Sequence, residues 1–456
     1  MSARQSPDNR FLTAPVGRIF ATTALPMVAI MTMNGLLGIV DAAFLGRFVG
    51  EEAIAAISIA FPILLVTIAL STLVGSGMSS LLARQLGAGA REEADATFAR
   101  AHGLAIMIGL ALILLFLIGG WMFATRMAGA AEPVARMAWV FLMITLLGTP
   151  MQFLLGIHAD AWRNEGRAGS MALMSLGVTA INILFNYILI VPFAMGVAGS
   201  ALSTVLAQGA GLALLIEGRR RSREMMPLGV LRRNAWHGQW GQIAALGAPV
   251  SLTFLGMALT ATCVVLALPA SGEDHSQAVA AYGIITRILG FAFLPPMAAA
   301  LAMQSIVGNN VGAGRWDRAD QVLRIAAVIA FIYGAAVELL LVTQGKMIAS
   351  AFIADTGVIE EVARILKPMA ALYLFSGPVL VLALYFQAIG RPLQAGLLTL
   401  MKSFVLVPVA IIVIAALLDR TAIWFAFPIA DGLTVAIAAV VLGAVAIRGG
   451  ERMRQG

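Results

Sequence analysis

The group best suited to chemistry in this sequence is the carboxylate of Asp41, which lies inside a hydrophobic run that starts near Phe20. An ionisable group at membrane depth costs about 3 kcal/mol or more, so a residue of this kind is usually functional. A buried carboxyl group can bind and release a proton, which is what an ion-coupled membrane protein requires. The alternative is a structural role, in which Asp41 caps a helix end or pairs with Arg47.

The composition places Asp41 in a membrane. Of the 456 residues, 60% are hydrophobic and 12% are charged, whereas a soluble domain has about 45–50% apolar and about 25% charged residues. Many apolar runs are long enough to cross a bilayer as helices. We therefore predict an all-α membrane protein with 12 transmembrane helices. These cover roughly residues 18–46, 54–83, 96–121, 136–157, 169–191, 196–216, 239–269, 278–308, 322–345, 362–389, 395–418 and 422–447.

The basic residues predict the orientation of these helices. If both termini are cytoplasmic, 21 of the 30 Lys and Arg residues lie on the cytoplasmic side and seven on the other. This bias follows the positive-inside rule, so the basic surplus reflects topology and no nucleic-acid partner is expected. The longest polar connection separates two lobes. The predicted parts are a cytoplasmic tail (1–17), an N-lobe of helices 1–6 (18–216), a basic cytoplasmic linker (217–238), a C-lobe of helices 7–12 (239–447) and a cytoplasmic tail (448–456).

The two lobes repeat one another. The stretch from Arg84 to Asp95 aligns with the stretch from Asn309 to Asp320 at an offset of 225 residues, and Pro26 aligns with Pro249 at an offset of 223. Gly166-Arg167 and Gly390-Arg391 align at 224. Matches at nearly one offset indicate a duplicated six-helix unit, and because six is even the two repeats have parallel topology.

The sequence gives little support for disulfide bonds, a metal site or a nucleotide-phosphate loop. The single cysteine, Cys263, permits no intrachain disulfide, and the four histidines lack metal-ligand spacing. The Gly-Ala-Gly loops lack the Lys and Ser/Thr of a phosphate loop. We expect no catalytic residues, no metal and no cofactor, so energy for any transport must come from an ion gradient or a substrate gradient.

Several stretches, in this order, give the chain a resemblance to the MATE (multidrug and toxic compound extrusion) family of transporters. They are Val40 to Gly46, the loops at Gly87 and Gly312, Asn182 to Asn186, Gly196 to Thr204, and Trp424 to Asp431. The resemblance covers essentially the whole chain and implies the V-shaped MATE fold. It also implies a proton or cation site at Asp41, Asn182, Asn186 and Thr204, and a kink in helix 1 at Pro26 that moves during transport.

One departure from the family bears on the coupling ion. Many members carry a second aspartate where this chain has Asn186, and helices 7 and 10 lack the acids of the Na⁺-coupled branch. One carboxylate can hold a proton, whereas dehydrated Na⁺ needs more oxygen ligands and charge. The chain therefore resembles the proton-coupled DinF-type branch more than the NorM type. The alternative is that Asn182 and Asn186 make only interhelical hydrogen bonds and that Thr204 bonds its own helix.

An ion pair and several thioether and aromatic side chains each have a structural and a functional interpretation. Lys402 and Asp431 are predicted to form a structural ion pair, with a second ion relay as the alternative. Thioether side chains fit many shapes, and several methionines and aromatic residues lie at suitable depth to line a substrate site, although apolar packing is the favoured interpretation for most of the methionines. The candidates for substrate lining are Met27, Met31, Met33, Asn34, Phe61, Met174, Tyr282 and Arg287.

The sequence and the resemblance together predict a multidrug efflux transporter of the bacterial-type inner membrane. It is expected to be a monomer that exchanges protons for organic cationic or amphipathic compounds through a central cavity with alternating access. The alternatives are a Na⁺-coupled MATE exporter and a lipid or polysaccharide-precursor flippase of the same superfamily. A membrane-embedded enzyme would need clustered catalytic residues, and a channel would not need the two-lobe duplication.

Overall fold

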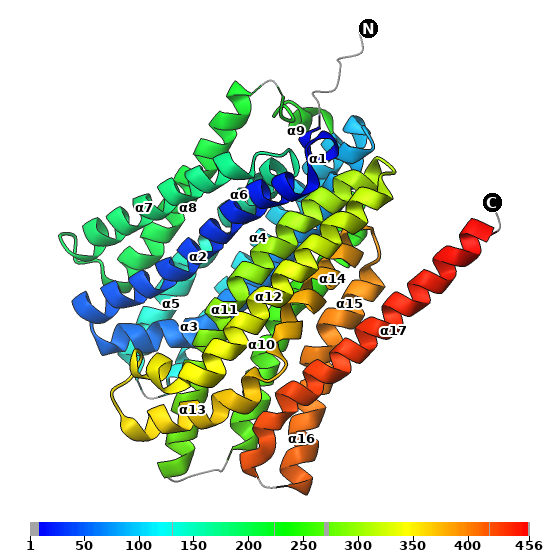
Figure 1. The fold of residues 1–456 in the computed structure, drawn as a ribbon. Helices are drawn as coiled ribbons and strands as arrows, with labels where there is room; N and C mark the ends of the chain where they lie inside the picture. Colours follow the sequence, from blue (N-terminus) through cyan, green and yellow to red (C-terminus); the bar gives the residue numbers. More distant parts are fainter. Residues whose placement is uncertain (1–8, 130, 223, 269–272, 419, 455–456) are drawn as a thin grey trace. The chain divides into compact units, whose positions relative to one another are not determined.

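The computed structural model describes residues 9–129, 131–222, 224–268, 273–418 and 420–454, and within them every regular element is helical (Figure 1). Among the described residues, ten helices are long and apolar enough to cross a membrane, and two bent helix pairs bring the total to 12 if each pair is one span. A backbone in hydrocarbon must satisfy its own hydrogen bonds, so these long apolar runs become helices. The predicted fold class is confirmed.

The chain folds as two compact units. The first comprises Met1–Ser251, Ser305–Ala319 and Ala388–Gly390, and the second comprises Leu252–Gln304, Asp320–Gln387 and Arg391–Gly456. The helices of the first unit are α1 (Arg10–Thr13), α2 (Val16–Phe48), α3 (Glu51–Gly87), α4 (Arg91–Ala128), α5 (Glu132–Leu147), α6 (Thr149–Asn164), α7 (Ala168–Ile190), α8 (Gly196–Arg221) and α9 (Val230–Arg233).

Two long helices contribute to both units, namely α10 (Trp240–Ala267) and α11 (Glu273–Gly312). The elements that lie mainly in the second unit are α12 (Trp316–Ser350), α13 (Thr356–Ala370), the 3₁₀ turn η1 (Tyr373–Phe375), α14 (Ser376–Ala388), α15 (Pro392–Leu400), the π-helix η2 (Met401–Leu406), α16 (Val407–Leu417), the 3₁₀ turn η3 (Arg420–Phe425) and α17 (Ala426–Arg454). In this unit α16 and α17 lie side by side.

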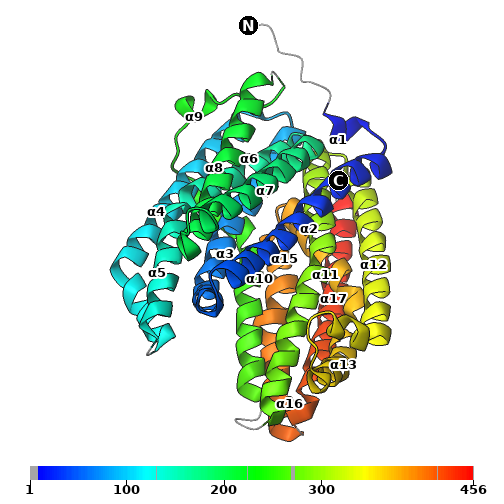
Figure 2. The ribbon, with the colours of Figure 1, turned by 90° about the vertical axis from the view of Figure 1, so that its left-hand side faces the viewer.

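In the first unit α7 packs against both α2 and α8, as Figure 2 also shows. A second group is formed by α3 with α4, α5 and α6. The helix α8 continues through Arg221, past its predicted end at 216. The N-terminal segment, the α3–α4 and α6–α7 connections and the segment after α8 meet at one end of this unit, where Arg91 and Arg167 lie. We call it the basic end.

The repeated glycine loops explain why the end of α11 belongs to the first unit. A Cβ added at Gly87 would lie 1.9 Å from the carbonyl oxygen of Asn309. In the other direction, a Cβ added at Gly312 would lie 2.0 Å from the carbonyl oxygen of Arg84. Each glycine thus lets its helix end approach the other copy of the same motif more closely than any side chain would allow.

The fourth and tenth predicted helices are bent, a feature that hydrophobic length did not reveal. The pair α5 and α6 is bent by 47° at Gly148, and the pair of α13 with Tyr373–Ala388 by 52°. At the second break Leu372 has a φ of 68°, and the carboxylate of Glu338 accepts hydrogen bonds from the backbone N–H groups of Leu372 and Leu374, at 3.2 and 3.0 Å. This side chain satisfies donors that the break leaves without helical partners.

Candidate functional site

The four residues predicted for the coupling site form one connected hydrogen-bond network. The amide nitrogen of Asn186 donates to Oδ1 of Asp41 at 2.5 Å and to the amide oxygen of Asn182 at 3.0 Å. The amide nitrogen of Asn182 in turn donates to the hydroxyl of Thr204 at 3.3 Å. The structure therefore brings these residues together from α2, α7 and α8.

The helix α7 positions the two amides at the centre of this network. Asn182 and Asn186 are four residues apart and so lie on one face of the helix. That face is covered by the neighbouring helices, because Asn182 is 2% exposed and Asn186 is fully buried. Asp41 on α2 is only partly buried. The network thus connects a partly accessible carboxylate with buried amides.

Ser203 belongs to the same network and was missed in the sequence. Its hydroxyl lies 2.7 Å from the amide oxygen of Asn186 and 2.7 Å from the carbonyl oxygen of Ser200, so its single proton can be donated to either acceptor. Thr204 also donates to the carbonyl of Ser200, at 3.2 Å, as its structural alternative predicted. The available signal was the adjacent Ser-Thr pair in α8, because both hydroxyls bond to amides of α7.

The orientation of Asn186 decides which of its side-chain atoms faces Asp41. Its amide nitrogen faces the carboxylate, and its oxygen faces Ser203. The oxygen of Asn182 also accepts a hydrogen bond. A hard cation prefers several oxygen ligands, and this arrangement offers it one carboxylate. No group of three His, Cys, Asp or Glu side chains with metal-binding geometry occurs in the described part of the chain. A proton needs only the carboxylate.

A cavity of about 360 Å³ adjoins the network, since Asn182 and Thr204 also line it. Its size falls in the range of about 300–1,000 Å³ typical of small-molecule sites. All lining residues are uncharged. They are Ile30, Asn34, Leu37, Gln152, Leu155, Gly156, Ala159, Met171, Met174, Ser175, Val178, Thr179, Asn182, Thr204, Ala207, Gln208, Gly211 and Leu215.

Two predicted lining residues, Asn34 and Met174, are in this cavity, and the amides of Gln152 and Gln208 were missed. Their occurrence in apolar helices was the signal that could have identified them. The other candidates lie elsewhere. Met27 is buried and Met31 and Met33 are partly buried in α2, Phe61 and Arg287 are exposed, and Tyr282 packs beside Trp424 in the core of the second unit.

Pro26 lies within α2, which continues as one helix across it. Proline has no N–H group, so the carbonyl of Thr22 loses its helical donor at this point. One turn earlier, the hydroxyls of Thr22 and Thr23 both bond to backbone carbonyl groups of the preceding turn. The helix therefore contains a weakened turn at Pro26, and the bending of this turn during transport stays a prediction.

Lys402 and Asp431 form the expected ion pair in the second unit. The side chain of Asp431 is 9% exposed and that of Lys402 is 29% exposed. Lys402 lies in the π-helix η2, a wider turn of a kind that is frequent at functional sites. The pairing is present, and the choice between a structural and a relay role stays a prediction.

The structure also brings together two histidines that are far apart in the sequence. His102 on α4 and His158 on α6 are both buried, and their Nε2 atoms are 3.3 Å apart. At this distance one ring donates and the other accepts. Nothing in their spacing along the chain indicated this contact, because it depends on how α4 packs against α6.

Comparison with known proteins places this arrangement in a family. The MatE family profile matches residues 26–188 and 249–417, one segment in each predicted repeat, which confirms the duplication. The FAD transporter of Shewanella oneidensis is 27% identical over 403 residues, covering 86% of each chain. The probable multidrug resistance protein YoeA of Bacillus subtilis is 24% identical over 434 residues, covering 92% of each.

A solved structure has the same fold. It is a MOP superfamily transporter from Pyrococcus furiosus, which matches with a TM-score of 0.87 and 22% identity over 98% of this chain and 99% of that chain. The two profile matches together span more than half of the sequence. The chain therefore belongs to the MatE family, whose members are membrane transporters and not enzymes.

Proposed function

We propose that this protein exports organic compounds, cationic or amphipathic, in exchange for protons across a bacterial inner membrane, with both termini in the cytoplasm. The proposal rests on one observation, namely that Asn182 and Thr204 each belong to two sites at once. Both residues belong to the network that ends at Asp41, and both line the uncharged cavity. A change of protonation at Asp41 is therefore transmitted to the ligand site through two contacts.

The coupling step follows from the chemistry of the network. While Asp41 is ionised, its bond from Asn186 is charge-assisted and strong. Protonation of the carboxyl removes the charge and weakens this bond, so Asn186 and Asn182 can rearrange and alter the cavity wall. Bending of α2 at Pro26 would then move Asp41 away from α7. Release of the substrate and of the proton on opposite sides of the membrane completes the exchange.

The lining of the cavity supports broad substrate selection. The thioethers of Met171 and Met174 adapt to different shapes. The amides of Gln152 and Gln208 offer both donors and acceptors, so they bind neutral polar groups of many kinds. A cationic substrate would gain from the negative charge of Asp41 at the end of the network and lose that gain on its protonation.

The choice of proton over Na⁺, and of the DinF-type branch over the NorM type, rests on the single carboxylate. In the first unit's network only Asp41 is acidic, and Asn186 occupies the position where the family resemblance implies a second acid. The amide nitrogen of Asn186 would also have to turn away before an oxygen of this residue could reach a metal ion.

The deciding experiment is substrate efflux from proteoliposomes in which the proton gradient and the sodium gradient are imposed separately. Wild-type protein is expected to respond to the proton gradient alone. Asp41→Asn is expected to abolish this response while it retains substrate binding. Full gradient-driven efflux by Asp41→Asn, or a requirement for Na⁺ without pH dependence, would disprove the coupling mechanism.

A second candidate, export of a flavin dinucleotide, is favoured by the named activity of the Shewanella relative. The 360 Å³ cavity lacks a cationic side chain that would pair with a pyrophosphate. We therefore rank this candidate below export of uncharged or cationic compounds. Competition between FAD and an amphipathic cation for efflux from the same proteoliposomes distinguishes the two, because only a FAD exporter would be inhibited by FAD.

A further inference from the structure

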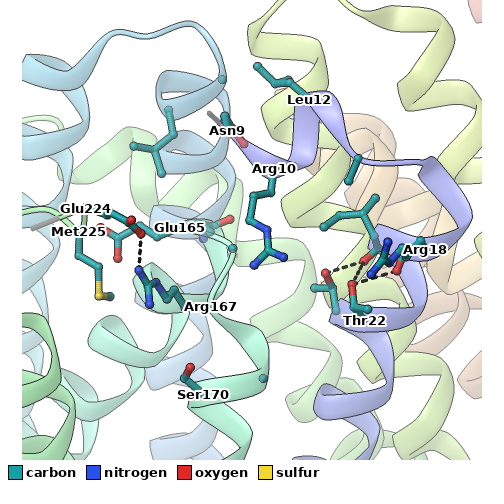
Figure 3. A pocket seen from close by; sticks show the side chains of 18 of the residues that line it. Asn9, Arg10, Leu12, Arg18, Thr22, Glu165, Arg167, Ser170, Glu224 and Met225 are labelled. Carbon is teal, nitrogen blue, oxygen red and sulfur yellow. Dashed lines mark hydrogen bonds and ion pairs between the residues drawn. The ribbon is translucent and has the colours of Figure 1, made fainter. Parts of the chain in front are cut away.

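A second and larger cavity, of about 1050 Å³, lies at the basic end of the first unit (Figure 3). Its lining includes Arg10, Arg18, Arg91 and Arg167, and we call it the arginine cavity. It shares no lining residue with the 360 Å³ cavity beside Asp41. The proposed transport cycle does not use it, so its chemistry calls for a separate explanation.

The wall that carries Arg10 is held firmly in place. The short helix α1 is anchored by Phe11, whose side chain is 1% exposed. Three backbone carbonyls of this segment accept hydrogen bonds of 2.6 to 3.2 Å from Asn310, Arg315 and Arg318. These donors belong to the second copy of the repeated glycine loop, while the first copy lines the cavity itself. The first copy of the duplicated motif thus lines the cavity directly, and the second copy holds the α1 segment in place.

The cavity holds cationic groups without partners. The guanidinium groups of Arg10 and Arg18 make no hydrogen bond or ion pair with the residues that the structure describes, whereas Arg167 is paired with Glu224. Figure 3 shows Arg10 reaching from α1 into the space between Glu165 and Arg167 on one side and Arg18 on the other. These two exposed guanidinium groups offer donors of the kind that suits a phosphate group.

Two residues of the opposite wall, Asn164 and Glu165, each have one buried acceptor atom without a hydrogen-bond partner in the described part of the chain, and Glu165 is also paired with Arg219. The two atoms are Oδ1 of Asn164 and Oε2 of Glu165. Oε1 of Glu165 is already occupied by Arg219 at 3.0 Å and by the backbone N–H of Met226 at 2.7 Å. The amide nitrogen of Asn164 bonds Ser79 and a backbone carbonyl, which fixes its oxygen as the free atom. Buried acceptors are unfavourable unless a donor reaches them.

We propose that the arginine cavity binds a phosphate ester that also carries a primary ammonium group, with the phosphate on Arg10 and Arg18 and the ammonium on Glu165 and Asn164. Two sources present this chemistry, namely the headgroup of phosphatidylethanolamine and soluble phosphoethanolamine. A trimethylated ammonium has no N–H donor and leaves both buried acceptors unsatisfied. The site therefore distinguishes ethanolamine esters from choline esters.

Binding to the full-length protein tests the site without altering it. Titration in detergent at constant ionic strength compares phosphoethanolamine, phosphocholine and inorganic phosphate by the rise in Tm. Nanodiscs of phosphatidylethanolamine and of phosphatidylcholine make the same comparison for lipids. A preference of about tenfold for the ethanolamine compound is expected in one arm, from the donors that choline lacks. The arm that shows the preference identifies the source.

Substitutions test which residues bind the phosphate of the ligand and which bind its ammonium group. Arg10→Gln and Arg18→Gln should each weaken binding of the ethanolamine compound by about tenfold, as loss of one charge-assisted bond does. Glu165→Gln should reduce its affinity to that of the choline compound. Arg220→Gln is the matched control, because Arg220 is an exposed arginine of α8 outside the cavity. Asp41→Asn should bind normally, which separates this site from the transport mechanism.

Three results would overturn the proposal. They are equal affinity for ethanolamine and choline compounds in both arms, no loss of binding in either Arg10→Gln or Arg18→Gln, and no binding of any probe. Glu165 also anchors Arg219, so Glu165→Gln must first show a normal Tm without ligand. If it does not, the comparison of ethanolamine and choline compounds on the wild-type protein still decides the ammonium half.

Discussion

Asn186 donates from its amide nitrogen to the carboxylate of Asp41 over 2.5 Å, and this contact links a fully buried amide to the one acidic group of the network. The contact depends on which way the amide is turned. Ser203 stabilises that orientation when its hydroxyl donates to the amide oxygen and not to the carbonyl of Ser200. A hydroxyl with no acid–base chemistry of its own therefore controls how Asp41 is solvated.

Ser203→Ala tests this control. Loss of the hydroxyl leaves a buried amide oxygen without its donor, which should cost about 1–2 kcal/mol of unfolding free energy. Asn186 would then be free to turn, so efflux should become less dependent on the proton gradient while substrate still binds. The measurement is efflux at several imposed pH gradients, with Ser58→Ala as the control because Ser58 is exposed and bonds only within its own helix. An unchanged gradient dependence would show that the orientation of Asn186 is irrelevant.

Replacing Gly87 tests the close approach of the two repeated loops. The Cβ of Gly87→Ala would lie 1.9 Å from the backbone oxygen of Asn309, and a backbone atom cannot move aside as a flexible side chain does. We expect a loss of about 2 kcal/mol or more in stability from overpacking, measured as a fall in Tm. Gly38→Ala is the matched control, since its Cβ would meet nothing within 4 Å and alanine favours the helix. A similar Tm for both variants would contradict the packing.

The pair of Lys402 and Asp431 offers a test of structure against function. Asp431→Asn leaves the partly buried ammonium of Lys402 without its counterion, and we expect a loss of about 2–3 kcal/mol in stability. The double change Lys402→Met with Asp431→Asn removes both charges and should recover most of it. Proton-driven efflux by the stable double variant then assigns the role. Full activity indicates a structural pair, and loss of activity indicates a relay.

Glu338→Ala probes the break in the tenth helix. The variant removes the acceptor of two backbone N–H groups, those of Leu372 and Leu374, and should destabilise the second unit by about 2 kcal/mol. Hydrogen exchange should show faster exchange at these two amides. Glu360→Ala serves as the control, because Glu360 is exposed and its contact with Lys346 is 3.4 Å long. Equal exchange in both variants would show that Glu338 is not the cap.

The sequence and the family resemblance determined the class of the protein and four members of its central network, but not Ser203. Helix number follows from hydrophobic length, and the duplication follows from matches at one offset, so neither requires knowledge of packing. Asp41 could be identified because charge is costly at membrane depth. Asn182 and Asn186 share a helix face because they are four residues apart, and the family resemblance assigned both of them, with Thr204, to the site of Asp41.

The tertiary structure decided what depends on contact between helices. Ser203 acts on Asn186 because α8 packs against α7, and Gln152 joins the cavity lining because α6 packs against α8. The bends of the fourth and tenth helices need a side chain or a proline at the break, which hydropathy does not detect. The orientation of Asn186 also depends on the tertiary structure. The sequence shows that residue 186 carries an amide, but the neighbouring side chains decide whether its nitrogen or its oxygen faces Asp41.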